Sequence, residues 1–212
     1  MTDIEARLDR LESLDAIRQL PAKYALTLDM RDIDMMVTLF PESVSVGKAG
    51  TGRKALRAYM DRTLRSPFTG TSHHIGGHII EFDGPDHAQG IVYSKNEHET
   101  PVENGKDEWV IMQMMYYDNY VREGGQWYFE RRLPLYWYAT DLNAPPTGEN
   151  KMRWPGQDQA EGNFHKLFPS CEEYWARNGD HDGPVLDPAP LEGFLNAMRR
   201  GKNAPRVKVR AD

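Results

Sequence analysis

The sequence predicts an α+β fold in which helices cover one face of a curved antiparallel sheet. Residues 4–40 and 53–64 repeat apolar side chains at steps of three and four, which is typical of amphipathic helices. Residues 71–138 instead form strand-like runs separated by short turns. Because the helices come first and antiparallel hairpins follow, the order of elements favours the α+β class.

The first helical segment carries one apolar stripe, which we expect to face a core: Ile4, Leu8, Leu11, Leu14, Ile17, Leu20, Tyr24 and Leu28. Pro21 lacks an N–H donor, so the helix is expected to kink or restart there. Asp29 lies where the stripe ends, and a carboxylate near a helix C-terminus opposes the helix dipole. Its position therefore indicates a second role, either as a cap on the next helix or as the partner of a cationic group.

The next elements are short. The apolar spacing of residues 33–40 predicts a second helix, and the alternation in residues 43–52, followed by glycines, predicts a short strand and turn. Residues 53–64 form a third helical pattern, which the loop residues 66–70 end. Four strands follow, separated by turns rich in Gly, Asn, Asp and Pro: 71–82, 88–98, 108–122 and 126–138.

The composition changes at about residue 140, which divides the chain into a domain of residues 1–139 and an extension of residues 140–212. Pro and Gly interrupt the extension repeatedly, and two short helical patterns lie at residues 169–178 and 191–201. Its aromatic residues are unlike those of a disordered tail. We expect the extension to form a lid over the domain or a contact with another subunit.

Composition excludes several classes of partner. The net charge of -6 argues against nucleic acid and against an acidic membrane surface. Cys171 is the single cysteine, so neither an intramolecular disulfide nor a cysteine metal cage is expected. The N-terminus does not read as a signal peptide and no apolar run matches a membrane span, so we expect a cytoplasmic protein. Phosphate-loop, dinucleotide and hydrolase-elbow motifs are not found in the sequence.

The strand at residues 71–82 holds a cluster of histidines. Strict alternation places His73 with Ile75 and Ile79 on one face, and His74 with His78 on the other. His74 and His78 would be roughly 13 Å apart along the strand, so a metal site is not expected. A histidine on the covered face is either a hydrogen-bonded core residue or a general base that a carboxylate orients. For His73, Asp29 is the candidate carboxylate.

The later strands place polar groups where a simple core would have aliphatic ones. Ser94, Asn96 and His98 share one face, which suggests a lined cavity, although an exposed strand face fits as well. On the next strand, one face carries Met112, Met114, Tyr116 and Asp118. Methionine and tyrosine together suit an adaptable apolar pocket, and ordinary packing with a subunit interface fits as well.

The last strand alternates Trp127, Phe129 and Arg131 against Tyr128, Glu130 and Arg132, so one arginine is expected on the covered side. There a guanidinium would stabilise Asp29 as its anion or bind a developing negative charge. Counted by alternation, Tyr136 and Tyr138 continue the face of Arg132 and add aromatic lining.

Together these residues resemble the SnoaL-like branch of the nuclear-transport-factor-2-like superfamily, over about residues 12–139. The residues that carry the resemblance are residues 17–20, Tyr24, Asp29, Arg31, Asp32, Phe40, residues 72–76, residues 120–122 and residues 125–127. The resemblance implies a cone of helices packed on a strongly curved antiparallel sheet. The SnoaL-like branch includes lyases of the scytalone dehydratase, bile-acid 7α-dehydratase and hexachlorocyclohexane dehydrochlorinase types, which use an aspartate–histidine pair and no cofactor.

By position, the resemblance implies that Asp29 and His73 form this pair, with Tyr24, His98 and Arg132 as further catalytic residues. The resemblance also implies that Met114 and Tyr116 line the pocket. With the residues that strand alternation selects, the expected substrate-binding residues are Asn96, Met112, Met114, Tyr116, Tyr136 and Tyr138. One departure is that the first-strand tyrosine of scytalone dehydratase has no counterpart near Gly47 and Lys48.

The expected function is a cofactor-independent acid–base lyase, with neither a metal nor an organic cofactor. It would dehydrate a small hydrophobic aromatic or polycyclic substrate, or release a fragment such as formaldehyde by retro-aldol cleavage. The alternatives are an isomerase or hydrolase with the same pocket, and a ligand-binding module without catalysis, because one fold hosts many functions. We expect a homodimer or homotrimer.

Overall fold

The computed structural model describes residues 2–101, 107–141 and 176. The helical elements come first: α1 (Asp3–Asp29), α2 (Ile33–Met36), 3-10 turns at Val37–Leu39 and Gly47–Ala49, α3 (Arg53–Met60) and a π-helical turn at Asp61–Arg65. Four strands follow: β1 (Gly70–Phe82), β2 (His87–Pro101), β3 (Asp107–Glu123) and β4 (Gln126–Asp141).

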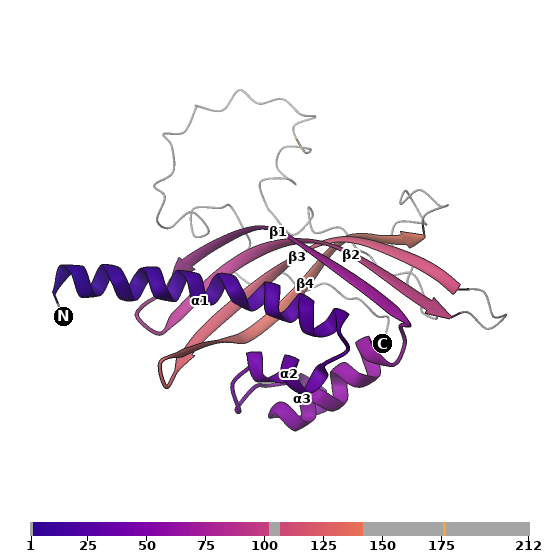
Figure 1. Ribbon diagram of the computed structural model, residues 1–212, viewed down its shortest axis with the longest axis horizontal. Helices are drawn as coiled ribbons and strands as arrows, with labels where there is room; N and C mark the ends of the chain where they lie inside the picture. Colours follow the sequence, from indigo (N-terminus) through magenta and orange to yellow (C-terminus); the bar gives the residue numbers. More distant parts are fainter. Residues whose placement is uncertain (1, 102–106, 142–175, 177–212) are drawn as a thin grey trace.

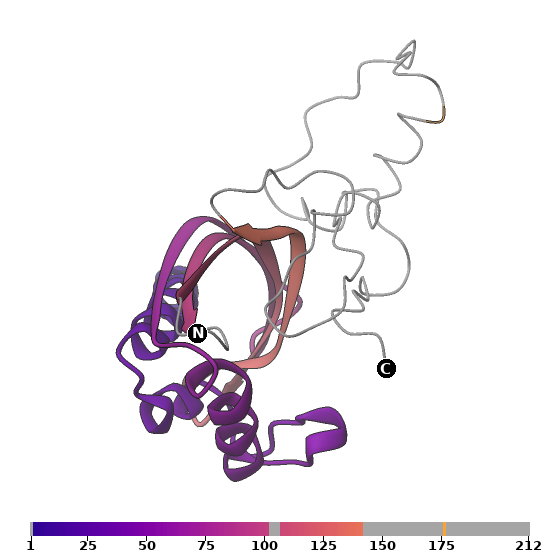
Figure 2. The same cartoon turned by 90° about the vertical axis from the view of Figure 1, so that its right-hand side faces the viewer.

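The strands form one antiparallel sheet in the order β1-β2-β3-β4. The sheet curls strongly without closing into a barrel, and the helices lie on one side of it (Figure 2). The predicted α+β class and the curved, helix-covered sheet are therefore confirmed. Each predicted strand ends within three residues of the observed one. The predicted strand at residues 43–52 is wrong in extent, because it is reduced to a single bridge between Ser45 and Thr51.

Helix α1 begins at a capping box, in which Thr2 and Glu5 exchange side-chain to backbone hydrogen bonds. It continues through Pro21, so the expected restart does not occur. The apolar stripe is buried only in the C-terminal half of the helix, at Ile17, Leu20, Tyr24 and Leu28.

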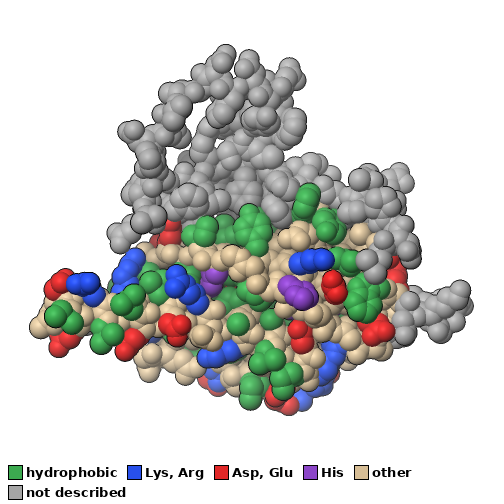
Figure 3. All heavy atoms as spheres, turned by 45° about the horizontal axis from the view of Figure 1, so that its top comes forward, with side chains coloured by type: hydrophobic (Ala, Val, Ile, Leu, Met, Phe, Trp, Pro, Cys, Tyr) green, Lys and Arg blue, Asp and Glu red, His purple; other side chains and the backbone are tan. Residues whose placement is uncertain are grey.

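The N-terminal part of the stripe does not face a core, contrary to the prediction. Ile4, Leu8 and Leu11 are 74%, 53% and 64% exposed. Figure 1 shows why, because α1 extends beyond the end of the sheet that its second half covers. On the surface in Figure 3, hydrophobic side chains stand among charged ones at this end of the molecule. Periodicity marks the face of a helix, whereas the length of the sheet decides how much of that face is covered.

Two groups of buried side chains form the core. The first joins the helices to one end of the sheet, and its central members are Ile17, Met36, Phe40, Tyr120 and Phe129. The second lies along β2, β3 and β4 at the other end: Val92, Val110, Met112, Met114, Tyr116, Tyr136 and Ala139. Met112 and Met114 lie side by side with Tyr116 and Tyr136 in the second group, and methionine side chains adapt readily to their surroundings.

A bulge in β1 corrects the predicted alternation of its histidines. The register with β2 shifts between Ile75 and His78, so the two faces exchange at Gly76 and Gly77. His78 therefore points to the helix side, where it contacts Tyr120, and Ile79 is 41% exposed. The prediction that His74 and His78 share a face is thus wrong.

Two further register shifts in β4 change the faces of its residues. The first, at Glu130, puts Arg132 on the same face as Trp127 and Phe129 rather than opposite to them. The second, at Trp137, separates Tyr136 from Tyr138: Tyr136 pairs with Met114, whereas Tyr138 pairs with Gln113 on the other face. The prediction that Tyr138 lines the interior is wrong for this reason.

The boundary at residue 139 lies two residues before the end of β4 at Asp141. The helices predicted at residues 169–178 and 191–201, and the lid role of the extension, lie outside the described residues apart from residue 176. Among the helices that the structure describes, none is long and apolar enough to cross a membrane.

Candidate active site

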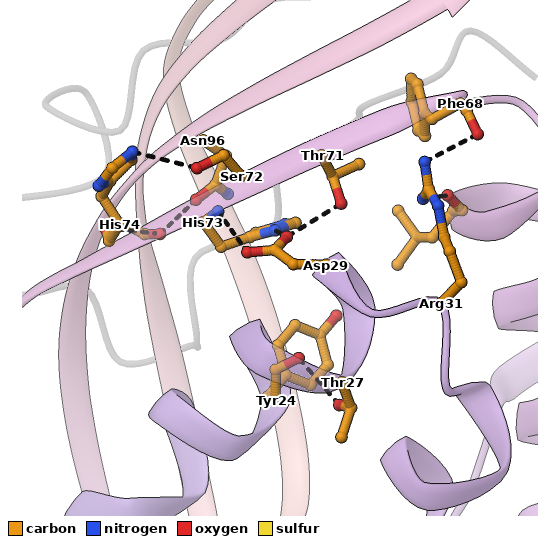
Figure 4. Close-up of polar contacts among 12 residues, drawn as sticks. Tyr24, Thr27, Asp29, Arg31, Phe68, Thr71, Ser72, His73, His74 and Asn96 are labelled. Atoms are coloured by element: carbon orange, nitrogen blue, oxygen red, sulfur yellow. Dashed lines mark hydrogen bonds and ion pairs between the residues drawn. The ribbon is translucent and has the colours of Figure 1, made fainter.

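Asp29, the last residue of α1, meets His73 on β1. The Oδ1 atom of Asp29 lies 2.6 Å from Nδ1 of His73, and its Oδ2 atom accepts a hydrogen bond of 2.9 Å from the His73 backbone N–H. The Thr71 hydroxyl donates to Oδ1 at 2.9 Å. Figure 4 shows the carboxylate held between the end of the helix and the strand. The capping role considered for Asp29 belongs to Asp32, which accepts from the Met35 N–H at the start of α2.

The carboxylate of Asp29 is held as its anion. Burial on its own would raise the pKa of Asp29, but hydrogen bonds from the ring and backbone of His73, the charge of that ring and the Thr71 hydroxyl outweigh burial and lower it. A carboxylate at this position fixes the orientation of the imidazole and stabilises the imidazolium when the ring takes up a proton. The helix end thus supplies the partner that the sequence suggested for Asp29.

The His73 side chain is 4% exposed and lines a cavity. Since Nδ1 is bound to Asp29, Nε2 is the nitrogen that remains to exchange a proton with a molecule in the cavity. Beside it lies His98 of β2, with ring centroids 5.3 Å apart and an edge-on arrangement. Burial, followed by the neighbouring His73, lowers the pKa of His98 to about 3, so His98 is neutral at physiological pH.

The cavity has a volume of about 560 Å³ and is mostly apolar, with a few polar groups. Nine of the residues selected from the sequence line it: Tyr24, His73, Asn96, His98, Met112, Met114, Tyr116, Arg132 and Tyr136. Asp29 lies behind His73 and reaches the cavity through it. Tyr138 does not line it, because of the bulge at Trp137.

A small polar network crosses the floor of the cavity. The Asn96 amide donates to the Tyr116 hydroxyl at 3.2 Å and to the Met114 sulfur at 2.9 Å, and its oxygen accepts from Ser94. Asn96 and Ser94 are each 1% exposed. These bonds fix the amide, so the Tyr116 hydroxyl can offer its own proton to a ligand.

Arg132 forms a cationic wall. Its guanidinium carbon lies 3.7 Å from the ring centroid of Tyr116, 4.5 Å from that of Tyr24 and 4.6 Å from that of Phe129. Its side chain is 4% exposed, and the nearest carboxylate is that of Asp118, with Nε and Oδ1 3.6 Å apart. Cation–π contacts of this kind are worth more where water is excluded.

The two tyrosines beside Arg132 stay protonated. Burial raises the pKa of both the Tyr24 and Tyr116 hydroxyls, against the opposing charge of Arg132. Their hydroxyls are therefore hydrogen-bond donors across the neutral pH range, which suits groups that hold an oxygen atom of a ligand.

Other residues that line the cavity were not predicted as site residues, although their apolar spacing predicted helices and a short strand. The helical side of the cavity is apolar and comes from α1 to the π-helical turn after α3: Leu28, Phe40, Val44, Val46, Leu56, Tyr59, Met60 and Leu64. Their periodic spacing assigned them to the core, and the same spacing fits a cavity wall. Thr71, which orients Asp29, carried no signal in the sequence.

No residues suited to a metal stand out in the described part of the chain. Groups of three or more His, Cys, Asp or Glu side chains that could hold an ion are not found there. The side chains that line the site include the imidazoles of His73 and His98, four tyrosines (Tyr24, Tyr59, Tyr116 and Tyr136), the Asn96 amide and the Arg132 guanidinium.

Comparisons with solved structures find the same fold in other proteins. A scytalone dehydratase-like protein from Novosphingobium aromaticivorans is 25% identical, with a TM-score of 0.54 over 70% of this chain and 97% of that one. A type 2 hexachlorocyclohexane dehydrochlorinase is 21% identical, with a TM-score of 0.57 over 71% and 99%. The type 3 enzyme from Novosphingobium barchaimii is 21% identical, with a TM-score of 0.58 over 66% and 96%. The two dehydrochlorinases are similar in fold.

Curated proteins gave no match to this chain. The family model for the SnoaL-like domain matches residues 9–133, which is more than half of the chain and includes the four strands up to the middle of β4. On this match, and on the helix-covered curved sheet, the chain belongs to the SnoaL-like domain family.

Proposed function

We propose that this protein is a cofactor-independent lyase that acts on a small hydrophobic molecule, aromatic or polycyclic. His73 is its base, and the carboxylate of Asp29 orients the imidazole. The observation that carries the proposal is the 2.6 Å contact between the two side chains at the wall of an apolar cavity. Membership of the SnoaL-like family and the scytalone dehydratase-like neighbour support a lyase.

The bond changes of an elimination are simple. Nε2 of His73 takes a proton from a carbon of the substrate, the C–H electron pair forms a double bond, and the leaving group departs from the neighbouring carbon with its own pair. In the retro-aldol form, His73 takes a hydroxyl proton instead, and the O–H electron pair forms the C=O bond of the released carbonyl fragment, such as formaldehyde. The pair of the broken C–C bond stays on the remaining carbon, which then takes a proton. Asp29 stabilises the imidazolium in both cases.

The leaving oxygen needs a proton or a hydrogen bond. Tyr24 and Tyr116 are the donors with raised pKa values, and either hydroxyl can hold or protonate it. His98 is neutral and acts as a hydrogen-bonding wall rather than as an acid. Arg132 faces the charge that develops on the reacting molecule, inside a site where the low dielectric strengthens its effect.

The size of the cavity sets the class of substrate. A volume of about 560 Å³ suits a molecule of one to a few fused rings, and the methionine and tyrosine walls suit an aromatic or alicyclic skeleton. Its lining includes the polar side chains of His73, Tyr116 and Arg132, so the substrate is expected to carry oxygen substituents.

The test is an assay without added cofactor. Purified protein is incubated with a panel of hydroxylated aromatic and steroid-like compounds, and products are followed by mass spectrometry. Loss of water or formaldehyde that depends on His73 supports the lyase. An unchanged mass with a new isomer indicates an isomerase, a gain of water indicates a hydrolase, and binding without any product indicates a ligand-binding module.

A further inference from the structure

Asp118 and Arg132 face each other across β3 and β4, and both are buried. Their side chains are 0% and 4% exposed, and Nε of Arg132 lies 3.6 Å from Oδ1 of Asp118. This distance is longer than a hydrogen bond, so the two charges attract without sharing a proton. Arg132 lines the cavity and Asp118 does not, which makes Arg132 the member of the pair that a ligand can reach.

The pair has unused hydrogen-bonding capacity. Within the described residues, all three nitrogens of the Arg132 guanidinium and Oδ1 of Asp118 are buried without a hydrogen-bond partner. A guanidinium has five N–H donors, and leaving a buried charge without hydrogen bonds is costly. Aromatic rings of Tyr24, Tyr116 and Phe129 surround it, and they offer no strong acceptor. The donors are therefore available to an acceptor that enters the cavity.

Asp118 is held from the side away from the cavity. Tyr120 donates a hydrogen bond of 3.1 Å to Oδ2 of Asp118, and Nε2 of His78 lies 2.9 Å from the Tyr120 hydroxyl. Gly90 on β2 pairs with Asp118, and its missing side chain leaves room for both rings. The carboxylate is thus fixed by a hydrogen bond, whereas the guanidinium is held by ring contacts that leave its N–H donors unused.

Charged and titratable groups from four elements lie around Asp118, and β2 contributes Gly90. Arg132 comes from β4, Tyr116 and Tyr120 from β3, His78 from β1 and Tyr24 from α1. Burial raises the pKa of Asp118 to about 6, although the charge of Arg132 and the Tyr120 hydroxyl oppose the shift. The carboxylate therefore keeps its charge at neutral pH chiefly because Arg132 is near.

We propose that Asp118 is a positioning residue that neutralises Arg132 in the empty site and takes up a proton when an anionic group of an aromatic ligand binds Arg132. The anion draws the guanidinium donors into the cavity, and a proton from solvent joins a carboxylate oxygen of Asp118, so the net charge of the buried site stays the same. The proposal deepens the proposed function and rests on it, because it assigns the substrate an anionic oxygen group, or one that becomes anionic in the reaction.

The test uses two probes of the same shape. Naphthalenesulfonate is anionic and naphthalenesulfonamide is neutral, and both fit an aromatic cavity of this size. Calorimetry in two buffers with different heats of ionisation measures affinity and proton uptake. We expect the sulfonate to bind roughly tenfold or more tightly at about pH 5.5 than at about pH 8, with uptake of close to one proton at the higher pH. The sulfonamide should show neither effect.

Three variants assign the proton. Asp118→Asn should bind the sulfonate at high pH as tightly as the unaltered protein does at low pH, without proton uptake. Asp118→Glu restores the carboxyl group and should restore the uptake. His73→Gln removes one of the two imidazoles that line the cavity and should keep the uptake. If Asp118→Asn does not fold, as judged by circular dichroism, His98→Gln takes its place: uptake that is kept in both histidine variants excludes the two imidazoles of the cavity, and uptake that is lost in either of them overturns the proposal.

The proposal is overturned if the sulfonate does not bind, if its binding is independent of pH, or if proton uptake is lost in His73→Gln and kept in Asp118→Asn. These binding results do not depend on turnover. Proton-linked binding without any product in the compound panel would therefore refute the lyase and leave the role of Asp118 standing, whereas turnover with pH-independent binding would do the reverse.

Discussion

Asp29 receives two hydrogen bonds from one residue, since both the ring nitrogen Nδ1 and the backbone N–H of His73 point at its carboxylate. This double contact ties the end of α1 to β1 and at the same time turns Nε2 of His73 toward the cavity. The orientation of the imidazole is thus part of how the helix docks on the sheet, and it does not depend on a ligand.

Replacement of either partner should remove activity while the fold survives. On a compound that the protein converts, His73→Gln and Asp29→Asn should lower kcat by roughly 10²- to 10⁴-fold, the usual value of one general acid–base group. Steady-state kinetics and a thermal melt measure the two properties. Asp32→Asn is the matched control, because asparagine also caps helices and Asp32 lies outside the cavity. Full activity in His73→Gln would refute the assignment of the base.

The exposed and buried halves of α1 should respond differently to the same kind of substitution. Ile17 is 0% exposed, so Ile17→Ala should lower the free energy of unfolding by about 2–5 kcal/mol through a cavity in the core. Leu11→Ala removes a side chain that is 64% exposed and should change it by about 0.5 kcal/mol or less. Urea unfolding compares them, and equal losses would mean that the N-terminal half of the helix is covered in solution.

The same helix shows what sequence could predict of this fold. Local rules act over a few residues, so the order of elements, the strand ends and the face of each helix follow from spacing and turn chemistry. How far α1 reaches past the sheet depends on the placement of both elements in space, and nothing in the spacing of Ile4, Leu8 and Leu11 reports it.

The candidate site was predictable to a similar extent. Residues on regular stretches of strand, such as Asn96, His98, Met114 and Tyr116, reach the cavity as alternation requires. Tyr138 does not, because a bulge adds one residue and reverses every face beyond it. Bulges carry only weak signals in a single sequence, so the resemblance to a family had to supply the place of Arg132.

Acid should destabilise the protein through His98. Its pKa is about 3 in the folded state against 6.5 for the free side chain, so the folded state binds this proton less readily than the unfolded one. The contribution of the neutral ring to stability is therefore complete above about pH 6.5 and declines as the pH falls toward about 3. His78, with a pKa of about 4, acts in the same direction, whereas Asp118 acts in the opposite one.

Removal of the His98 ring should flatten this dependence. Between about pH 6.5 and about pH 4.5, His98→Gln should lose about 2–3 kcal/mol less unfolding free energy than the unaltered protein. Urea unfolding at several pH values measures the slope. His87→Gln, a change at an exposed histidine at the start of β2, is the matched control and should leave the slope unaltered. An identical slope in His98→Gln would mean that the ring takes up its proton as readily in the folded protein as in the unfolded chain.

Gly90 on β2 should matter more to stability than Gly77, which lies in the bulge of β1. A Cβ atom at Gly90 would lie 2.8 Å from the Ile79 carbonyl oxygen, 3.0 Å from the Tyr120 ring and 3.1 Å from Nε2 of His78, whereas one at Gly77 would have nothing within 4 Å. Gly90→Ala should therefore lower the unfolding free energy by about 1–3 kcal/mol, the usual cost of overpacking, and Gly77→Ala should change it little.

The clash at Gly90 also has a local effect that stability alone does not report. Movement of Tyr120 and His78 would loosen the hydrogen bond to Oδ2 of Asp118, so Gly90→Ala should disturb the environment of the cavity beside Arg132. The test is the affinity for naphthalenesulfonate, measured without urea and at a temperature well below the melting point. A variant as stable as Gly77→Ala with unchanged affinity would show that the sheet relaxes around the added methyl group, and that β2 does not fix the rings as its backbone contacts imply.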